Sequence, residues 1–286
     1  MHKNLNLDTG KIIENLEVTK NHFLLSILLS SPCQSALPGQ FIMMRKQGVK
    51  DPLLSRPLSV YGFYQTEAGT VLEFLFRVVG KGTLALSRLT AGDTVDVLGP
   101  LGRPFTVFPD RQRILLVAGG IGVAPLSYLA EHLCALSLRK KTGTFGSKSP
   151  IITLYFGANT ANALVSLPKI ERHCSGLRLA TIDGSAGFQG NVTDLLRHDL
   201  NSFRQNELCL YACGPNPMIR SLAEVLQPTS IPCQVSVEER MACGIGACLG
   251  CSLKVKREPE GWAYCQVCTE GPVFDIRDII WNQTET

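Results

Sequence analysis

The sequence has no apolar run long enough to cross a membrane. One of its longest apolar stretches, FLLSILL from Phe23, is far shorter than the ~20 residues that a membrane-spanning helix needs. The first ten residues, MHKNLNLDTG, are polar and lack the apolar segment of a secretion signal. We therefore expect a soluble, cytoplasmic protein with no membrane partner.

An excess of one charge is also missing. The 28 lysines and arginines nearly balance the 24 aspartates and glutamates, which gives a formal net charge of +4. The most prominent basic cluster, Arg139–Lys141, precedes the polar insert Thr142–Ser149 and has no interleaved aromatic residues. These features give no support to nucleic-acid binding. The hydrophobic content of 45% over 286 residues fits two globular domains and a small third one.

Short apolar runs separated by proline, glycine and aspartate fill the chain from Lys11 to about Val107. They include FLLSILL, GQFIMMR, RPLSVYGF, VLEFLFRVVG and DTVDVLGPLG. Their spacing favours antiparallel strands, and no long helical period interrupts them. We predict an antiparallel β-barrel domain over residues 1–108.

Strands and helices alternate from Arg113 onwards. RILLVAGG and PIITLYFGAN are continuous apolar runs, typical of strands buried on both faces, and LRLATID and ELCLYACGP follow them. Helical periods occur in VAPLSYLAEHLCALSLRKK and NPMIRSLAEVL. This alternation predicts a parallel-sheet α/β domain over residues 109–232, and a small third domain over residues 233–286.

Cysteine, in contrast, is abundant. The chain has 11 cysteines, and Cys243, Cys248 and Cys251 follow the spacing C-x4-C-x2-C. In a reducing compartment such clusters indicate metal or redox ligands rather than disulfides. Together with a more distant cysteine, this is the spacing of plant-type [2Fe–2S] proteins. Cys268 is the expected fourth ligand, although Cys265 lies only three residues before it.

Glycines in the cysteine loop support the cluster interpretation. Gly244, Gly246 and Gly250 allow the backbone to wrap closely and to direct amide groups at the sulfur atoms. Two alternatives remain open, a structural zinc site and cysteines that simply fill the core. Zinc ligands usually come as two closely spaced pairs, whereas this chain has one loop and one distant cysteine.

Two segments of the first domain have features of a diphosphate site. RPLSVYG, from Arg56 to Gly62, begins with an arginine that could bind a diphosphate bidentately. RVVGKGTLALSRL, from Arg77 to Leu89, is a strand followed by a glycine-rich turn and the expected start of a helix, whose amide groups would bind phosphate. An ordinary strand–turn–helix would give the second pattern as well.

A glycine turn between strand and helix marks the second domain. LLVAGGIGVAPL has Gly119, Gly120 and Gly122 in the turn and Pro125 at the start of the helix. Such a turn lets a dinucleotide pyrophosphate approach the backbone, although tight packing alone would also select glycine. FGANT and YACGPNPM end two further strands and would flank the same crevice. Because FGANTANALVS has no lysine or arginine to meet a 2′-phosphate, we expect NADH rather than NADPH.

Together these motifs resemble the ferredoxin–NADP reductase superfamily. Its members have a flavin-binding barrel with an R-x-x-S motif and a nucleotide domain with GG-x-G-x-x-P and CGP-x-x-M. This chain has RPLS, GGIGVAP and CGPNPM in the same order. With ERMACGIGACLGC and CTEGPVF, the resemblance narrows to the electron-transfer subunits of dihydroorotate dehydrogenase B. It covers nearly the whole chain, and the cysteine loop is its most specific part.

The resemblance implies three redox groups: FAD in the barrel, NAD(H) as substrate on the second domain, and a [2Fe–2S] cluster in the third. The implied FAD contacts are Arg56, Pro57, Leu58, Ser59, Leu75, Phe76, Arg77, Gly82 and Thr83. The implied NAD(H) contacts are Gly119, Gly120, Gly122, Pro125, Cys213, Gly214 and Pro215. The implied cluster ligands are Cys243, Cys248, Cys251 and Cys268.

The resemblance also implies an electron relay with no catalytic residue of its own for carbon chemistry. Flavin belongs between a two-electron nicotinamide and a one-electron cluster. The relay would serve a separate FMN-containing subunit that oxidises dihydroorotate to orotate in pyrimidine biosynthesis, in an expected heterotetramer of two plus two chains. One alternative is a related reductase subunit with a ferredoxin- or sulfide-linked partner. Another is a non-enzymatic zinc-loop protein for assembly or redox sensing.

Overall fold

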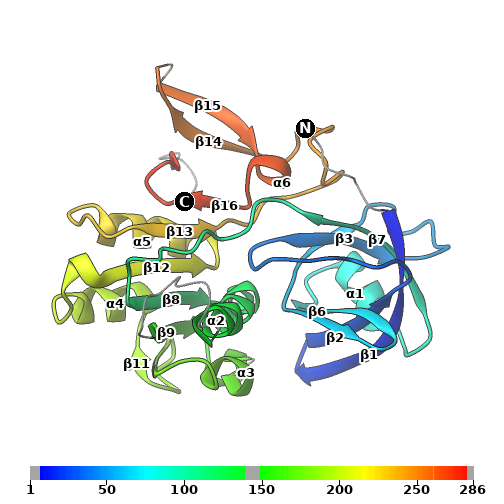
Figure 1. The fold of residues 1–286 in the computed structure, drawn as a ribbon, viewed down its shortest axis with the longest axis horizontal. Coiled ribbons are helices and arrows are strands. Elements are labelled where there is room, and N and C mark those ends of the chain that lie inside the picture. Colours follow the sequence, from blue (N-terminus) through cyan, green and yellow to red (C-terminus); the bar gives the residue numbers. More distant parts are fainter. Residues whose placement is uncertain (1–6, 139–148, 166, 260, 282–286) are drawn as a thin grey trace.

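The computed structural model describes residues 7–138, 149–165, 167–259 and 261–281. Two large lobes lie side by side, a barrel formed by the first part of the chain and an α/β domain, and the C-terminal segment lies above them in Figure 1. The polar insert expected at 142–149 falls outside the described residues except for its last position. None of the described helices is long and apolar enough to cross a membrane.

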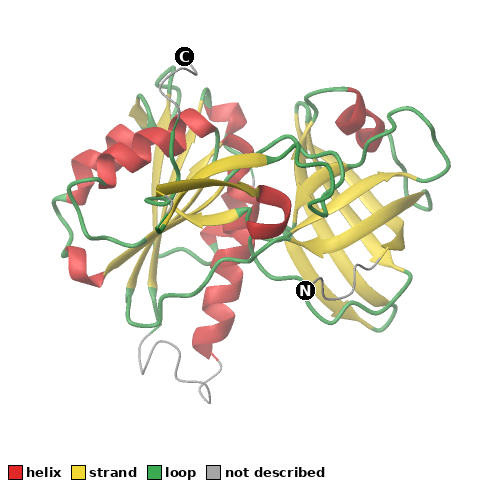
Figure 2. Cartoon of the chain, turned by 90° about the horizontal axis from the view of Figure 1, so that it is seen from above, coloured by secondary structure: helices red, strands yellow, loops and turns green. Residues whose placement is uncertain are grey.

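The first lobe is a seven-stranded antiparallel sheet in the order β4-β3-β7-β1-β2-β6-β5, curled into a barrel (Figure 2). Its elements are β1 (Leu7–Thr19), β2 (His22–Leu29), β3 (Phe41–Lys46), β4 (Arg56–Ser59), β5 (Gly62–Thr66), β6 (Gly69–Arg77), α1 (Lys81–Ser87) and β7 (Thr94–Leu101). Apolar side chains such as Ile27, Leu72 and Phe74 are completely buried inside it. The predicted barrel is confirmed.

The second lobe is a seven-stranded sheet in the order β11-β10-β9-β8-β12-β13-β16. Its strands are β8 (Arg113–Gly119), β9 (Ile151–Ala158), β10 (Gly176–Thr181), β11 (Phe188–Gln189), β12 (Leu208–Cys213), β13 (Cys233–Ser236) and β16 (Val273–Asp275). All neighbours are parallel except β13 and β16, which are antiparallel. Both β13 and β16 come from the segment 233–286, so the sheet continues past residue 232.

Helices cover both faces of this sheet (Figure 2). They are α2 (Val123–Leu138), α3 (Leu167–Glu171), α4 (Val192–Leu200) and α5 (Asn216–Leu226), with short 3-10 turns η1 (Gly120–Gly122), η2 (Ala161–Ala163) and η3 (Gln205–Glu207). On β8, Ile114 and Leu116 belong to the core with α2, whereas Leu115 and Val117 belong to the core with α4 and α5. This burial on both faces explains why the strand sequence is continuously apolar.

The remaining C-terminal elements are β14 (Ser252–Arg257), β15 (Gly261–Gln266) and the short helix α6 (Val267–Glu270). β14 and β15 pair as an antiparallel hairpin that projects from the molecule in Figure 1. One face of the hairpin buries Val255 and Cys265, and the other exposes Trp262 and Tyr264. The cysteine loop, 243–251, leads into this hairpin.

Candidate functional site

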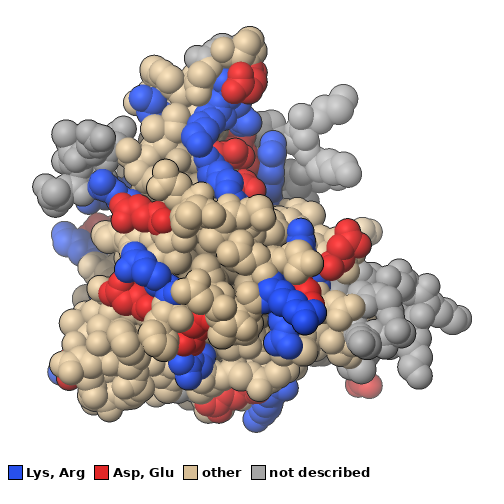
Figure 3. Space-filling model, turned by 90° about the vertical axis from the view of Figure 1, so that its left-hand side faces the viewer, with Lys and Arg blue, Asp and Glu red and all other residues tan. Residues whose placement is uncertain are grey.

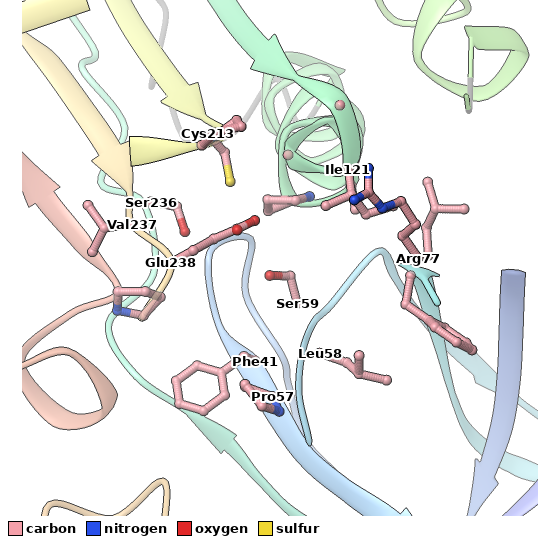
Figure 4. A pocket seen from close by; sticks show the side chains of 18 of the residues that line it. Phe41, Pro57, Leu58, Ser59, Arg77, Ile121, Cys213, Ser236, Val237 and Glu238 are labelled. Carbon is pink, nitrogen blue, oxygen red and sulfur yellow. The ribbon is translucent and has the colours of Figure 1, made fainter. Parts of the chain in front are cut away.

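A cavity of about 400 Å³ lies between the barrel and the α/β domain (Figure 4). Its walls come from β4 and β6, from the turns after β8 and β12, and from the segment after β13. The expected site residues that line it are Pro57, Leu58, Ser59, Leu75, Phe76, Arg77, Thr83, Gly119, Gly120, Gly122, Pro125, Cys213 and Pro215. Arg56, Gly82 and Gly214 do not line it, but each is next in sequence to a residue that does. Segments far apart in the chain therefore meet at one place.

The Arg56 guanidinium packs against the start of α1. A side-chain carbon at Gly82 would collide with the guanidinium, so glycine is needed for this contact. Arg56 Nη1 donates to the carbonyl oxygens of Leu54 at 3.0 Å and Ser55 at 3.3 Å. These contacts fix a positive charge beside the first turn of a helix, and both the charge and the helix amides favour a bound anion.

Thr83 shapes the turn that precedes α1. Its hydroxyl accepts hydrogen bonds from the amides of Val79 at 2.9 Å and Gly80 at 3.3 Å, and it can donate to the Gly80 carbonyl at 3.1 Å. The hydroxyl is thus engaged within the turn. Thr83 contributes to the cavity chiefly by holding this turn in place.

The turns after β8 and β12 pack against each other. Because the two strands are parallel neighbours, their carboxyl ends meet at one edge of the sheet. A side-chain carbon at Gly122 would come within 2.7 Å of the Gly214 nitrogen, and one at Gly119 within 2.9 Å of Pro215 Cδ. Packing accounts for these glycines. Gly120 differs, because its φ is +52° and a side-chain carbon added there would face open space.

Glu238, which belongs to none of the predicted motifs, lines the same cavity. Its side chain keeps an exposed surface and points into the cavity beside Ser236 and Cys213 (Figure 4). Burial raises the pKa of the Glu238 carboxyl, and the positive charge of Arg77 opposes this shift only in part. Glu238 lies two residues after β13, at the carboxyl edge shared with β12. Recognising 233–236 as a strand of the sheet would have pointed to this residue.

Backbone amides of the cysteine loop and of α6 are directed at the sulfur atoms of the expected ligands. The four contacts are Ile245 N to Cys243 Sγ (3.5 Å), Cys248 N to Cys243 Sγ (3.4 Å), Gly246 N to Cys268 Sγ (3.2 Å) and Cys268 N to Cys251 Sγ (3.4 Å). Gly244 and Gly246 have φ of +74° and +79°, which permits the tight wrapping of the loop. Amide donors of this kind stabilise thiolate ligands of an iron–sulfur cluster.

The thiols influence one another. Burial acts to raise the pKa of Cys243, but hydrogen bonds from the amides of the loop outweigh it and bring the pKa to about 7. Burial raises the pKa of Cys268 to about 12, and the neighbouring Cys251 and Cys243 add to this shift. The Cys248 side chain also hydrogen-bonds to Cys243, so all four expected ligands lie close enough to interact. Of these four cysteines, only Cys248 is exposed.

The convergence of side chains on one point and the surroundings of Cys265 both bear on which residues are ligands. Among the described residues, no group of three or more His, Cys, Asp or Glu side chains is placed to hold one metal ion. The thiol donors and the amides aimed at them fit the ligands of an iron–sulfur cluster. Cys265 belongs to a different environment, because its thiol is buried under the hairpin and directed at the carbonyl oxygen of Leu253 at 3.6 Å.

The cysteine loop lies next to the cavity. Met241, two residues before Cys243, lines the cavity itself. A side-chain carbon at Gly244 would come within 2.5 Å of Met43 Cγ, and Met43 is paired across β3 and β4 with Pro57 of the cavity wall. Two short routes therefore connect the cavity wall with the cysteine loop.

Comparison with known proteins identifies the same three parts. Residues 9–105 match the family described as the oxidoreductase FAD-binding domain, and residues 116–224 match the oxidoreductase NAD-binding domain. Residues 238–280 match the iron-sulfur cluster binding domain of dihydroorotate dehydrogenase B. Each match falls on the part of the chain that contributes one of the three sets of site residues.

Full-length relatives carry the same name. A protein of Desulforamulus reducens named dihydroorotate dehydrogenase B (NAD(+)), electron transfer subunit, is 34% identical over 273 residues, which cover 96% of this chain and 98% of the relative. One of Geobacillus kaustophilus with this name is 39% identical over 245 residues, which cover 85% and 86%. The chain belongs to the family of dihydroorotate dehydrogenase B electron transfer subunits. As a member of this family it is an oxidoreductase subunit with FAD, NAD(H) and iron–sulfur sites.

Solved structures share the fold of this electron transfer subunit. A chain of an NADH-dependent reduced ferredoxin–NADP oxidoreductase, described in connection with flavin-based electron bifurcation, has a TM-score of 0.77 and 28% identity, covering 95% of this chain and 90% of that one. A ferredoxin NADP+ reductase of Neisseria gonorrhoeae, solved with bound FAD and NADP, has a TM-score of 0.60 and 17% identity, covering 80% and 93%. The second likeness concerns the fold alone.

Proposed function

We propose that this chain passes electrons between NAD(H) and an FMN-containing partner subunit that converts dihydroorotate to orotate. The observation that carries the proposal is the common cavity, lined by the barrel motif, by the glycine turns and by Met241, which lies two residues before the cysteine loop. Bound FAD would supply the exchange between hydride transfer and single-electron transfer. The names of the full-length relatives support dihydroorotate dehydrogenase as the complex that this chain serves.

Each wall of the cavity has its own part in this proposal. Pro57, Leu58 and Ser59 with the strand end Leu75–Arg77 would hold the flavin, and Arg56 would neutralise its diphosphate from behind the wall. The open space at Gly120 would admit the nicotinamide dinucleotide from the opposite side.

The three sites suggest a division of the chain and of the complex. We assign residues 1–108 to FAD, 109–232 to NAD(H) and 233–286 to the cluster, bound by Cys243, Cys248, Cys251 and Cys268. The complex would contain two copies of this chain and two of the FMN subunit, in the cytoplasm. On the face shown in Figure 3, basic and acidic side chains of the described residues are intermixed, which fits a protein partner better than a nucleic acid.

A second candidate function deserves a test because of one observation. The chain of the NADH-dependent reduced ferredoxin–NADP oxidoreductase matches this chain over nearly its full length. The cavity and cysteine loop could serve a ferredoxin-linked partner in the same way. The two candidates differ only in what receives or supplies electrons at the cluster.

Purification from the source cell distinguishes the candidates. We expect the chain to co-purify with an FMN-containing subunit, with one FAD and two irons per chain and a mass for two plus two subunits. The complex should reduce NAD+ with dihydroorotate. A ferredoxin-linked partner without dihydroorotate activity would favour the second candidate, and a colourless protein with stoichiometric zinc would contradict both.

A further inference from the structure

Lys169 of α3 lies at the seam between the two lobes. Its Nζ donates hydrogen bonds to the Tyr61 carbonyl oxygen at 3.1 Å, the Tyr64 hydroxyl at 3.0 Å and Glu73 Oε2 at 3.1 Å. It also lies 3.9 Å above the centre of the Tyr61 ring and 3.7 Å from Glu131 Oε2. Only 21% of its side chain is exposed. One ammonium group therefore has partners on both lobes.

The partners of Lys169 sit on the elements that carry the cavity walls. Glu73 lies on β6, two residues before the lining residue Leu75, and Tyr61 lies two residues after the lining residue Ser59. Glu131 lies on α2, the helix that begins directly after the glycine turn at Gly120–Gly122. In Figure 1, α2 and α3 are the helices of the α/β domain that face the barrel. Lys169 thus connects β6, which forms part of the cavity wall on the barrel side, to α2, the helix that follows the glycine turn on the opposite wall.

The ammonium group of Lys169 balances the negative charges of two neighbouring carboxylates. Glu73 and Glu131 have 22% and 30% of their side chains exposed, and both face the Lys169 ammonium. Within the described residues, Glu131 Oε2 is buried and accepts no hydrogen bond. Burial raises the pKa of Tyr64, and the charges of Glu73 and Glu131 raise it further, so both carboxylates lie close to this hydroxyl. Removing the ammonium would leave two carboxylates that repel each other across the seam.

We propose that Lys169 is a positioning residue for hydride transfer. It sets the distance between the two walls of the cavity, the one formed by β4 and β6, where the flavin would bind, and the one formed by the glycine turns, where the nicotinamide would bind. It touches neither cofactor site directly, and it acts through β6 and α2. Transfer of a hydride requires close approach of the two rings, and a shift of ~1 Å can cost about 100-fold in rate. The inference rests on reduction of the flavin by NADH in this cavity, as the proposed function requires.

The two lobes should remain associated when Lys169 is replaced. Tyr128 of α2 donates a hydrogen bond of 2.6 Å to the Ala36 carbonyl oxygen of the barrel, and this bond does not involve Lys169. The variant Lys169→Met keeps most of the apolar volume of the side chain and removes the charge. Repulsion between the carboxylates should then widen the seam without separating the lobes.

The test uses the full chain with FAD and cluster bound. In stopped-flow experiments at saturating NADH, the FAD bound to Lys169→Met should be reduced by NADH at least about tenfold more slowly than the FAD of the wild type. Reduction by dithionite, which needs no nicotinamide, should keep its rate, and FAD content should be unchanged. The double variant Lys169→Met/Glu73→Gln removes the repulsion and should recover part of the NADH rate.

Two variants control for loss of an ion pair as such. Arg45→Met removes the pair with Asp96 inside the barrel, at 2.8 Å, and Arg178→Met removes the pair with Asp199 inside the α/β domain, at 2.8 Å. Neither should slow reduction by NADH. The inference is overturned if Lys169→Met matches the wild-type rate, if its loss of rate follows loss of FAD, or if the dithionite rate falls equally. A wild-type protein whose flavin NADH does not reduce would contradict the proposed function instead.

Discussion

Arg56 does not line the cavity, yet we propose that it neutralises the FAD diphosphate. Its guanidinium is held between the carbonyl oxygens of 54 and 55 and the start of α1, which Gly82 leaves open. Arg56→Ala should weaken FAD binding by roughly 1.5–3 kcal/mol, the value of a charged hydrogen bond. Titration of the apoprotein with FAD measures this. Arg45→Ala, on the neighbouring strand β3, is the control, and equal FAD affinity of the two variants would contradict the assignment.

Cys268 and Cys265 lie in different surroundings, and this difference indicates which of them is the fourth cluster ligand. Cys268 Sγ accepts the Gly246 amide of the cysteine loop, whereas Cys265 is directed at Leu253 of the hairpin. We expect Cys268→Ser to destroy the visible absorption of the cluster and Cys265→Ser to leave it largely intact. Iron analysis of both variants provides the second measurement. Equal damage, or greater damage in Cys265→Ser, would show that the fourth ligand is misassigned.

Glu238 should make stability depend on pH. Because burial raises its pKa above the ordinary 4.5, the folded state favours the protonated carboxyl. In the wild type, the contribution of Glu238 to the free energy of unfolding is greatest below pH 4.5, and it declines as the pH rises through the raised pKa. The variant Glu238→Gln lacks this decline. Its Tm relative to the wild type should therefore increase from about pH 5 to about pH 8 in the FAD-loaded protein. A constant difference between the two proteins would contradict the shifted pKa.

Local sequence patterns could point to Arg56 but not to Glu238, and the reason is physical. Arg56 lies in RPLS, where arginine, proline and serine occur together on one short strand. Glu238 has ordinary neighbours in sequence, and only the pairing of β13 with β12 brings it to the cavity. A residue whose environment arises from a distant pairing leaves no local signal.

At the scale of elements, the turns after β8 and β12 pack so closely that a larger residue at Gly122 should disturb them. In Gly122→Ala, the added carbon would meet the backbone at Cys213 and Gly214, where no flexible side chain can move away. We expect a lower Tm and a KM for NADH raised several-fold, with FAD content unchanged. Gly176→Ala in the same sheet is the matched control, because its added carbon makes only ordinary contacts at 3.4 Å with Thr153. A Gly122→Ala variant with wild-type KM would refute this view of the turn.

The elements themselves could largely be predicted from periodicity, but not all of their partners. The expected helix VAPLSYLAEHLCALSLRKK contains α2, which ends at Leu138, and its last three residues lie outside the described residues; NPMIRSLAEVL is α5. The segment GPVFDI of the predicted third domain forms β16, and its place beside β13 in the nucleotide sheet was not expected. Parallel and edge pairings join segments that are distant in sequence, so alternation of apolar residues identifies a strand without identifying its neighbour.

At the scale of the molecule, the cavity and the cysteine loop should be separable in function. The walls that would hold FAD and NADH come mainly from the two lobes, whereas the cysteine loop meets them only at Gly244 and through the preceding residue Met241. We expect Cys248→Ser to remove the cluster with little disturbance of the core, because Cys248 is exposed. NADH oxidation with a soluble two-electron dye should continue at nearly the wild-type rate.

Electron delivery to the FMN subunit should behave in the opposite way. If the cluster is the link between the cavity and the partner, the cluster-free variant loses this activity although its flavin is still reduced by NADH. Co-elution of Cys248→Ser with the FMN subunit is the necessary control, because a variant that no longer binds would also fail to deliver electrons. A variant that binds its partner, lacks iron and still reduces FMN from NADH at the wild-type rate would show that electrons leave the flavin by another route. The position of Met241 on the cavity wall, two residues from Cys243, favours the route through the cluster.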